Sequence, residues 1–299
     1  MHPQIAPYDA DMENENRYQP LPGQWLPRMS DDHFNCFRDL AKSHAGISLP
    51  NQKRNMVYRR VSKRLSALGL KDFDAYRHVL LGPGADREIE HFINALTTNK
   101  TEFFRENHHF EHFASTVLPW VRERAGKHGG QKLRLWSAGC STGQETYSTA
   151  MTLVEAMSDL SRWDAKILGT DIDTNVIEFA REGVYSSAEL ESIPEKLHRK
   201  FVELLPAETY GRMSGALRSL ITFNPLNLHD TWPMRGKFDA IYCRNVIIYF
   251  DFADQCRLFD RFADLLCEGG YVYIGHSESL FKVTERFRPM GQSIYQRIA

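Results

Sequence analysis

Several features that would define a class of protein are missing from this chain. Its 299 residues include only five cysteines, which are widely spaced and form no C-x-x-C pair, and this disfavours a disulfide framework and a zinc knuckle. No apolar run is long enough to span a bilayer, and the first residues lack the basic-then-apolar order of an export signal. We therefore expect a soluble protein of the reducing cytoplasm.

An excess of charge of one sign is also absent. The chain has 37 Lys and Arg against 38 Asp and Glu, which gives a formal net charge of −1. This balance provides no overall attraction to nucleic acid or to an anionic membrane. We expect neither nucleic-acid binding nor membrane insertion.

The pattern of apolar residues divides the chain into three parts. Residues 1–27 are polar and rich in proline, which predicts a disordered tail. Residues 28–98 place apolar side chains at three- and four-residue intervals in segments that end near glycine, which predicts a small all-α domain. Residues 99–299 begin with a helix over about 106–124 and continue as short apolar runs that alternate with amphipathic helices, which predicts a parallel sheet.

The expected elements of this α/β part can be placed more closely. Strands are expected at 133–138, 166–171, 219–226, 238–245 and 271–276. Helices are expected to begin at Glu145, Thr174 and Phe252, and residues 293–298 suit a closing edge strand. The alternation is interrupted at about 184–218, which is too long for an ordinary connection and predicts an inserted subdomain.

A turn of small residues follows the first expected strand, in the stretch LWSAGCSTGQETYS. Gly139 and Gly143 match neither the dinucleotide spacing G-x-G-x-x-G nor a phosphate-binding P-loop. Glu145 would lie in the first turn of the next helix, where it would repel a pyrophosphate. We interpret the turn as a site for a positively charged cofactor; the alternative is a tight strand-to-helix connection that binds nothing.

The second expected strand ends at Asp171, 26 positions beyond Glu145. This is close to the offset at which doubly wound folds present a carboxylate to a ribose diol. The alternative is that this acidic stretch only caps the following helix, with Asp173 or Thr174 as the N-cap.

Two further clusters contain polar residues at places where ligands bind. Arg105 lies in NKTEFFRENHHF, at the junction of the two domains, and its alternative role is that of a solvated helix-start arginine. In the same stretch His108 and His112 share a helix face, but no carboxylate completes a known metal motif, so we expect no metal. Arg244 and Asn245 end the apolar run DAIYCRNVIIYFD, where open α/β sheets bind ligands.

The residues of this second cluster also have structural alternatives. Arg244 suits an internal salt bridge, Asn245 a turn cap, and Tyr249 a core position with a solvated hydroxyl.

The expected helix NQKRNMVYRRVSKRL adds a basic stripe that includes Arg59, Arg60 and Lys63. Without further information, this stripe is either a solvated face or a site for an acidic partner.

Taken together, NKTEFFRENHHF, LWSAGCSTGQETYS, GTDIDTNVIEFAREGVY, FNPLNL, CRNVIIYFD and GHSESL closely resemble the chemotaxis receptor methyltransferases called CheR. The resemblance runs from about Met29 to Ile298. It implies a class I, Rossmann-like methyltransferase domain with a small inserted β-subdomain, preceded by a small all-α domain. It also implies S-adenosylmethionine as the cofactor and S-adenosylhomocysteine as its product, which agrees with the cation inferred beside Glu145. The cofactor-contacting positions that it implies are Asn99, Thr101, Arg105, Gly139, Glu145, Asp171, Asn227, Leu228, Arg244 and Asn245.

The resemblance further implies methyl transfer to glutamate side chains in the cytoplasmic domain of methyl-accepting chemoreceptors. Arg105 and Tyr249 match the family's candidates for orienting the acceptor, and Arg59, Arg60 and Lys63 would face the receptor. We expect a monomer, and whether a receptor's C-terminal peptide binds the β-subdomain stays open. The alternatives are a methyltransferase of the same fold with another acceptor, an adaptor-like relative in a signalling complex, and a non-catalytic module that binds S-adenosylmethionine.

Overall fold

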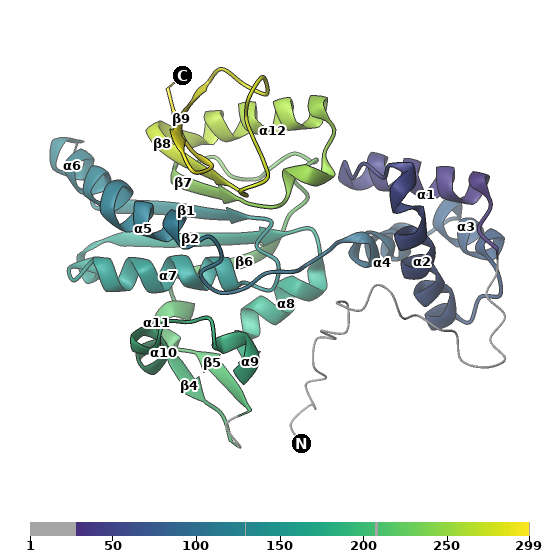
Figure 1. Cartoon of the computed structure of the whole chain (residues 1–299), viewed down its shortest axis with the longest axis horizontal. Helices are drawn as coiled ribbons and strands as arrows, with labels where there is room; N and C mark the ends of the chain where they lie inside the picture. Colours follow the sequence, from purple (N-terminus) through teal and green to yellow (C-terminus); the bar gives the residue numbers. More distant parts are fainter. Residues whose placement is uncertain (1–27, 129, 207–208, 299) are drawn as a thin grey trace.

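The computed structural model describes residues 28–128, 130–206 and 209–298. The tail expected at 1–27 lies outside these described residues. An all-α domain and a larger α/β domain lie side by side (Figure 1). Within the described part of the chain, no helix has both the length and the apolar character needed to cross a membrane.

The N-terminal domain consists of helices packed around one apolar core. Its elements are α1 (Asp31–Ala45), η2 (Asn51–Lys53), α2 (Arg54–Leu68), α3 (Phe73–Leu81) and α4 (Asp86–Leu96). Helix α1 begins at a capping box in which the Ser30 side chain accepts from the His33 N–H, and it ends at Gly46 in the left-handed conformation. Phe37 and Phe92 are among the rings that fill the core. The expectation of a small all-α domain is confirmed.

The helix expected at about 106–124 begins later and is not uniform. It is divided into α5 (His108–His112), the π-helical η3 (Phe113–Val117) and α6 (Leu118–His128). Phe104 and Glu106 have φ angles of 56° and 54°. These left-handed conformations are incompatible with a helix, so the expected start at residue 106 is wrong.

The α/β domain is built on a seven-stranded sheet with the order β6-β2-β1-β7-β8-β10-β9. The strands are β1 (Lys132–Ala138), β2 (Asp164–Asp171), β6 (Ile221–Pro225), β7 (Phe238–Cys243), β8 (Leu266–Ile274), β9 (Phe287–Gly291) and β10 (Ile294–Arg297). The first five pair in parallel, as the alternation of strands and helices predicted. The C-terminal strand is not the edge, however, because β10 pairs with both β8 and β9. The edge strand β9 contains Pro289, which lacks an N–H and is tolerated at a sheet edge.

Helices cover both faces of this sheet (Figure 1). One face packs against α7 (Gln144–Ala156), α8 (Thr174–Glu182) and the helices α5 and α6. The other face packs against α12 (Phe252–Leu265), where Trp136 of β1 meets Phe262. Short helical turns lie at η4 (Leu160–Arg162) and η5 (Ile247–Tyr249). The helices expected to begin near Glu145, Thr174 and Phe252 are confirmed.

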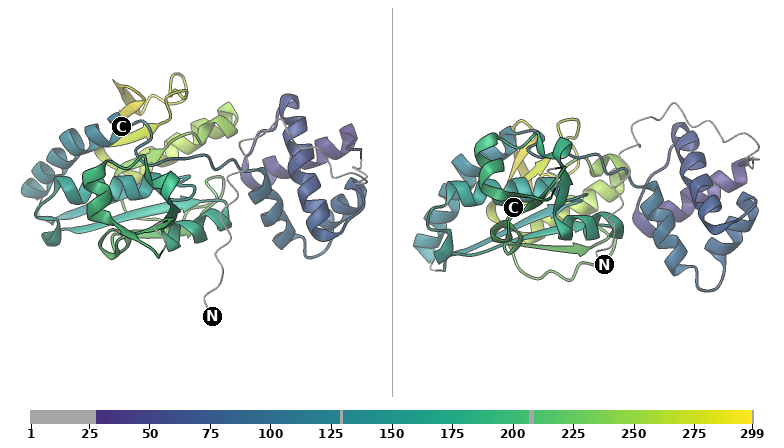
Figure 2. Two further views of the ribbon diagram at one scale, coloured as in Figure 1. Left: turned by 60° about the horizontal axis from the view of Figure 1, so that its bottom comes forward. Right: turned by 90° about the horizontal axis from the view of Figure 1, so that it is seen from below.

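The insertion between β2 and β6 forms a second, smaller sheet that projects from the domain at the bottom of Figure 1 and is turned toward the viewer in Figure 2. Its elements are β3 (Val184–Ser186), α9 (Ser187–Leu190), α10 (Glu195–Phe201), β4 (Val202–Leu204), β5 (Tyr210–Met213) and α11 (Gly215–Arg218). The three strands are antiparallel in the order β3-β5-β4, so β3 and β4 are the outer strands. The expected inserted β-subdomain is confirmed.

Candidate active site

A cleft lies where the carboxyl ends of the parallel strands face the all-α domain. Its volume is about 980 Å³, counted with the open solvent at its mouth. Ala45, Ile47 and residues 96–102 contribute the wall on the side of the all-α domain. All residues that the sequence suggested for cofactor or acceptor binding at the sheet line this cleft: Asn99, Thr101, Arg105, Gly139, Glu145, Asp171, Asn227, Leu228, Arg244, Asn245 and Tyr249. Their individual roles stay predictions.

The turn after β1 brings the backbone close to the cleft. Gly139 has a φ angle of 81° and donates its N–H to the Thr170 carbonyl at 2.7 Å. A Cβ at this position would lie 2.3 Å from Val246 Cγ2. Gly143, with a φ angle of 97°, begins α7. Glycine is therefore required at residue 139 both by the backbone conformation and by the neighbouring side chain.

Gly139→Ala is expected to displace Val246 and to weaken binding of S-adenosylhomocysteine at least about tenfold, because overpacking costs roughly 1–3 kcal/mol and left-handed strain adds to it. Gly69→Ala is the matched control. Gly69 also has a positive φ angle, 66°, but a Cβ there meets no atom within 4 Å. Calorimetric titration of both variants checks this prediction, and equal affinities would contradict it.

Asp171 lies at the end of β2 and is 8% exposed. Its carboxylate accepts the Ser141 N–H at 2.8 Å and the Asp173 N–H at 3.0 Å. Asp173, and not Asp171, caps α8 by accepting the Asn175 N–H. The capping alternative therefore does not account for Asp171. Burial raises the pKa of Asp171 to about 6, despite the two backbone hydrogen bonds that favour its charged form.

The raised pKa of Asp171 predicts a pH dependence of cofactor binding. Because its carboxylate would accept the ribose hydroxyls more strongly when it is ionised, affinity should fall as the pH decreases through about 6. Asp171→Asn should bind at least about tenfold more weakly at pH 8 and lose this pH step, since charge-assisted hydrogen bonds are lost. Titrations between pH 5 and 8 test this, with Glu178→Gln on the exposed side of α8 as the control. A pH step that persists in Asp171→Asn would contradict the ribose assignment.

Arg244 joins two carboxylates beside the turn. Its Nη1 lies 3.1 Å from Glu145 Oε2, and its Nη2 lies 3.3 Å from Glu106 Oε2. Arg244 also donates to the Arg105 carbonyl, and Ser137 Oγ donates to Glu145 Oε1 at 2.7 Å. Burial raises the pKa of Glu145, and Arg244 opposes that rise. The chain itself thus supplies one cation for Glu145, which the sequence argument had sought in a ligand alone.

Glu106 is a residue of this site that the sequence analysis missed. Besides Arg244, its carboxylate contacts His276 Nδ1 at 2.9 Å. Its pKa is lowered: burial alone would raise it, but the hydrogen bond from His276 and the charge of Arg244 lower it more. Nothing local in the sequence pairs Glu106 with these residues, which lie more than a hundred positions away.

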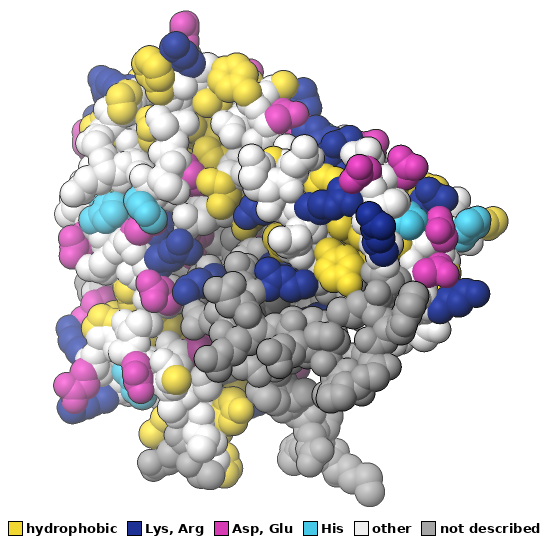
Figure 3. Space-filling view, turned by 45° about the vertical axis from the view of Figure 1, so that its right-hand side comes forward, with side chains coloured by type: hydrophobic (Ala, Val, Ile, Leu, Met, Phe, Trp, Pro, Cys, Tyr) yellow, Lys and Arg dark blue, Asp and Glu magenta, His cyan; other side chains and the backbone are white. Residues whose placement is uncertain are grey.

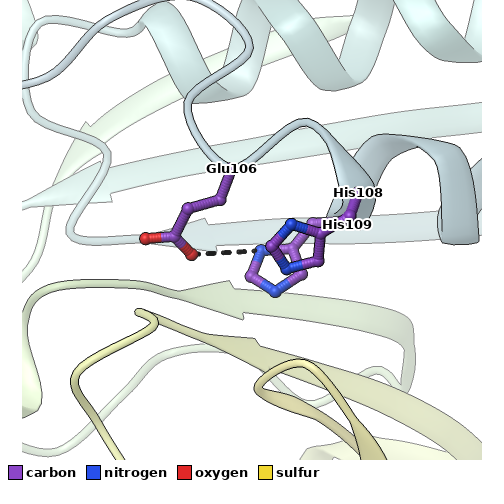
Figure 4. Close-up of side chains that lie close together, drawn as sticks. All are labelled: Glu106, His108 and His109. Atoms are coloured by element: carbon purple, nitrogen blue, oxygen red, sulfur yellow. Dashed lines mark ion pairs between the residues drawn. The ribbon is translucent and has the colours of Figure 1, made fainter.

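Glu106, His108 and His109 place possible metal-ligand atoms within 4.8 Å of one another (Figure 4). Glu106 Oε2 lies 3.6 Å from His109 Nδ1. His112, which was compared with His108 as a possible ligand, instead contacts the Tyr273 hydroxyl at 3.0 Å. The Arg244 guanidinium lies against the same Glu106 carboxylate and would repel a metal ion, so we assign no metal to this cluster.

Other cleft residues are also held by the protein. Arg105 is partly exposed and donates Nη1 to the Lys100 carbonyl at 3.1 Å. Asn99 Nδ2 donates to Asp173 at 2.8 Å, and Asn227 Nδ2 donates to the His44 carbonyl at 2.6 Å. The contact between Asn227 and His44 joins the two domains at the cleft.

The basic helix α2 lies outside the cleft lining. Arg60 donates to the Ala95 and Thr97 carbonyls and to Thr98 Oγ1, so the structure places it against the end of α4. Arg59 is partly exposed and Lys63 is exposed. On the face drawn in Figure 3, Lys and Arg side chains are interspersed with Asp and Glu side chains. A role for α2 in binding a partner stays a prediction.

Comparison with known proteins gives consistent matches over most of the chain. The family model described as CheR methyltransferase, SAM binding domain, matches residues 99–296, and CheR methyltransferase, all-alpha domain, matches residues 32–97. The chain is 44% identical to a probable chemotaxis protein methyltransferase from Rhizobium etli, over 79% of this chain and 88% of that protein. It is 42% identical to the chemotaxis protein methyltransferase of Escherichia coli, over 89% of this chain and 91% of that protein. It is 41% identical to chemotaxis protein methyltransferase 2 of Pseudomonas aeruginosa, over 88% of this chain and 92% of that protein.

Proposed function

Since this chain belongs to the CheR methyltransferase family and binds S-adenosylmethionine, we propose that it methylates glutamate side chains in the cytoplasmic domains of bacterial chemoreceptors. The products would be glutamyl methyl esters and S-adenosylhomocysteine. The observation that carries this proposal is a single cleft lined both by buried carboxylates suited to a cationic cofactor and by Arg105 and Tyr249.

The residues present fit this cofactor. Glu145 and Asp171 are buried acids in the cleft, and acids of this kind suit a sulfonium, an ammonium group and a ribose diol. Gly139 lines the cleft, and the turn that it forms brings the backbone to the cleft wall. Asn227 and Leu228 also line the cleft, and we propose that they border the adenine of the cofactor. The bound cofactor supplies a methyl group activated by a positively charged sulfur.

The role of the protein in methyl transfer would be placement. A glutamate with a pKa near about 4.3 is already ionised at neutral pH, so its carboxylate oxygen can attack without a general base. Holding that oxygen in line with the methyl carbon raises its effective concentration, and a cleft poor in water weakens its hydration. Arg105 would direct the carboxylate, but binding it too tightly would stabilise the anion more than the transition state and slow transfer.

Helix α2 is proposed to face an acidic receptor surface. Arg59→Glu combined with Lys63→Glu should raise KM for the receptor and reduce the salt dependence of methylation, because exposed charges act mainly on encounter and are screened over about 8 Å. The value of kcat should change little. Lys132→Glu combined with Lys166→Glu is the matched control, since both lysines are exposed at the amino ends of β1 and β2, opposite the cleft. If both double variants behave like the wild type, α2 is only a solvated face.

The inserted subdomain offers a place for a receptor's C-terminal peptide. Among the described residues, β3 and β4 are the outer strands of its sheet, and an extended peptide can add beside an outer strand. Leu204 at the end of β4 is 54% exposed. We propose this tethering as a second contact with the receptor, in addition to the contact through α2.

Transfer of labelled methyl groups to a panel of receptor cytoplasmic domains, with and without their C-terminal tails, tests these proposals. We expect incorporation into receptors, and more incorporation at low receptor concentration when the tail is present. Incorporation only into other proteins would favour a methyltransferase of the same fold with another acceptor. Binding of S-adenosylmethionine without turnover on any receptor would favour the non-catalytic module.

A further inference from the structure

A buried carboxylate lies next to the cleft without being one of its lining residues. Glu278 is 8% exposed and belongs to the turn that follows β8. Its Oε2 accepts the N–H of Asn245 at 3.0 Å and that of Gly275 at 2.6 Å. Burial raises the pKa of Glu278, and the hydrogen bonds that it accepts from backbone N–H groups oppose this rise. Hydrogen bonds from backbone N–H groups to a carboxylate are among the stronger ones in proteins.

Asn245, one of the two donors, begins the loop that follows β7 and covers residues 245–250. Asn245 adopts the left-handed conformation, at a φ angle of 58°, which is costly unless the surroundings enforce it. Gly275 packs against this residue, since a Cβ on Gly275 would lie 2.5 Å from Asn245 Nδ2. On its other side, the loop is held by Gln255 Nε2, which donates to the carbonyls of Ile247 and Phe250 at 3.0 Å each.

This loop lines the cleft and also contacts the turn after β1 and the all-α domain. Asn245, Val246 and Tyr249 line the cleft. Val246 also packs against Gly139 of the turn after β1. The Tyr249 carbonyl accepts the Ser48 N–H of the all-α domain at 2.7 Å. A change in the loop would therefore affect the cofactor turn, the acceptor-orienting tyrosine and the contact between the domains together.

We propose that Glu278 is a positioning residue, whose carboxylate holds the loop 245–250 in the conformation that presents Asn245 and Tyr249 to the cleft. The part that concerns Tyr249 rests on the proposed function, whereas the part that concerns cofactor binding does not. Without the carboxylate, the N–H groups of Asn245 and Gly275 lose their acceptor, and the left-handed Asn245 loses its support. The fraction of molecules with a competent loop then falls, and the apparent affinity for the cofactor falls by the same factor.

Glu278→Gln tests this proposal, because it keeps the shape of the side chain but removes the charge that strengthens the hydrogen bonds from Asn245 and Gly275. We expect amide hydrogen exchange at residues 245–249 to accelerate, while exchange in the central strand β1 stays as in the wild type. The dissociation constant for S-adenosylhomocysteine should rise about tenfold. Glu285→Gln, an exposed glutamate on the segment between β8 and β9, is the matched control and should change neither quantity.

Glu278→Asp keeps the charge but shortens the side chain, and it serves if the glutamine variant does not fold. It should change the same two quantities in the same direction by smaller factors. Wild-type exchange in the loop together with wild-type affinity in a folded variant would overturn the proposal. So would a uniform acceleration of exchange across the sheet with unchanged affinity, which indicates a merely structural role. Neither amide exchange nor affinity for S-adenosylhomocysteine depends on a methyl acceptor. If the proposed receptor substrate is wrong, the wild type will instead show no methyl transfer to receptors, so the two failures can be told apart.

Discussion

Arg244→Met is expected to lower the free energy of unfolding by about 3–5 kcal/mol and to abolish measurable cofactor binding. The reason is that Arg244 is 6% exposed and lies between Glu145 and Glu106, so its removal leaves two carboxylates without their shared cation in a dry site. Denaturant unfolding and calorimetric titration measure the two effects. Arg122→Met is the control, because Arg122 pairs with Asp159 on the surface and such pairs contribute at most about 1 kcal/mol.

The loss of stability in Arg244→Met should depend on pH. Burial already raises the pKa of Glu145, and removal of Arg244 takes away a cation that opposes this rise. A carboxyl whose pKa is raised in the folded state destabilises the protein only when it is ionised, so the deficit should shrink as the pH falls. Adding Glu145→Gln should recover part of the stability at pH 7 without restoring cofactor binding. If Arg244→Met lost no more unfolding free energy than Arg122→Met, the pairing of Arg244 with Glu145 and Glu106 would not have the importance that we assign to it.

Arg105→Ala is expected to lower kcat/KM for methyl transfer roughly a hundredfold, since a small misplacement of the acceptor has effects of this size. Arg105 offers charge as well as direction, and it also lines the cofactor cleft, so both binding and transfer should suffer. Arg87→Ala, at an exposed arginine on α4, is the control. Full activity of Arg105→Ala on the receptor would remove Arg105 from the proposed mechanism.

Tyr249→Phe separates orientation from cofactor binding. It removes one hydroxyl and should lower kcat while the affinity for S-adenosylmethionine stays within about twofold of the wild type. With no general base, the wild-type rate should be flat from about pH 6.5 to 8.5. A sharp rise through neutral pH that disappears in Tyr249→Phe would assign proton chemistry to the tyrosine instead of placement.

Most of the cleft could be predicted because its parts are local in the sequence. The turn at Gly139 and the carboxylate of Asp171 each follow an apolar run, and the carboxyl ends of parallel strands meet at one edge of a sheet. Arg244 could be assigned to that edge for the same reason. The all-α domain was equally clear, because capping residues and three- and four-residue spacing are also local signals.

The remaining features depend on contacts between distant residues. The pairing of Glu106 with Arg244 joins two loops that no local pattern connects. The support of Asn245 by Glu278 is likewise a contact between two separate loops. Strand β9 was not expected from the sequence, so the C-terminal strand was placed at the edge that β9 occupies. The contact of Arg60 with α4 was missed because a basic stripe has the same spacing whether its side chains face solvent or a neighbouring helix.

The chemical nature of the product tests the central claim most directly. The wild-type protein, S-adenosylmethionine labelled in its methyl group and a receptor cytoplasmic domain are incubated together, and the labelled receptor is then treated with mild alkali. A glutamyl methyl ester is cleaved by alkali and releases the label as volatile methanol, and replacing the acceptor glutamates by alanine should prevent labelling. We predict both results. Label that resists alkali, or label that persists in the alanine variant of the receptor, would contradict the account.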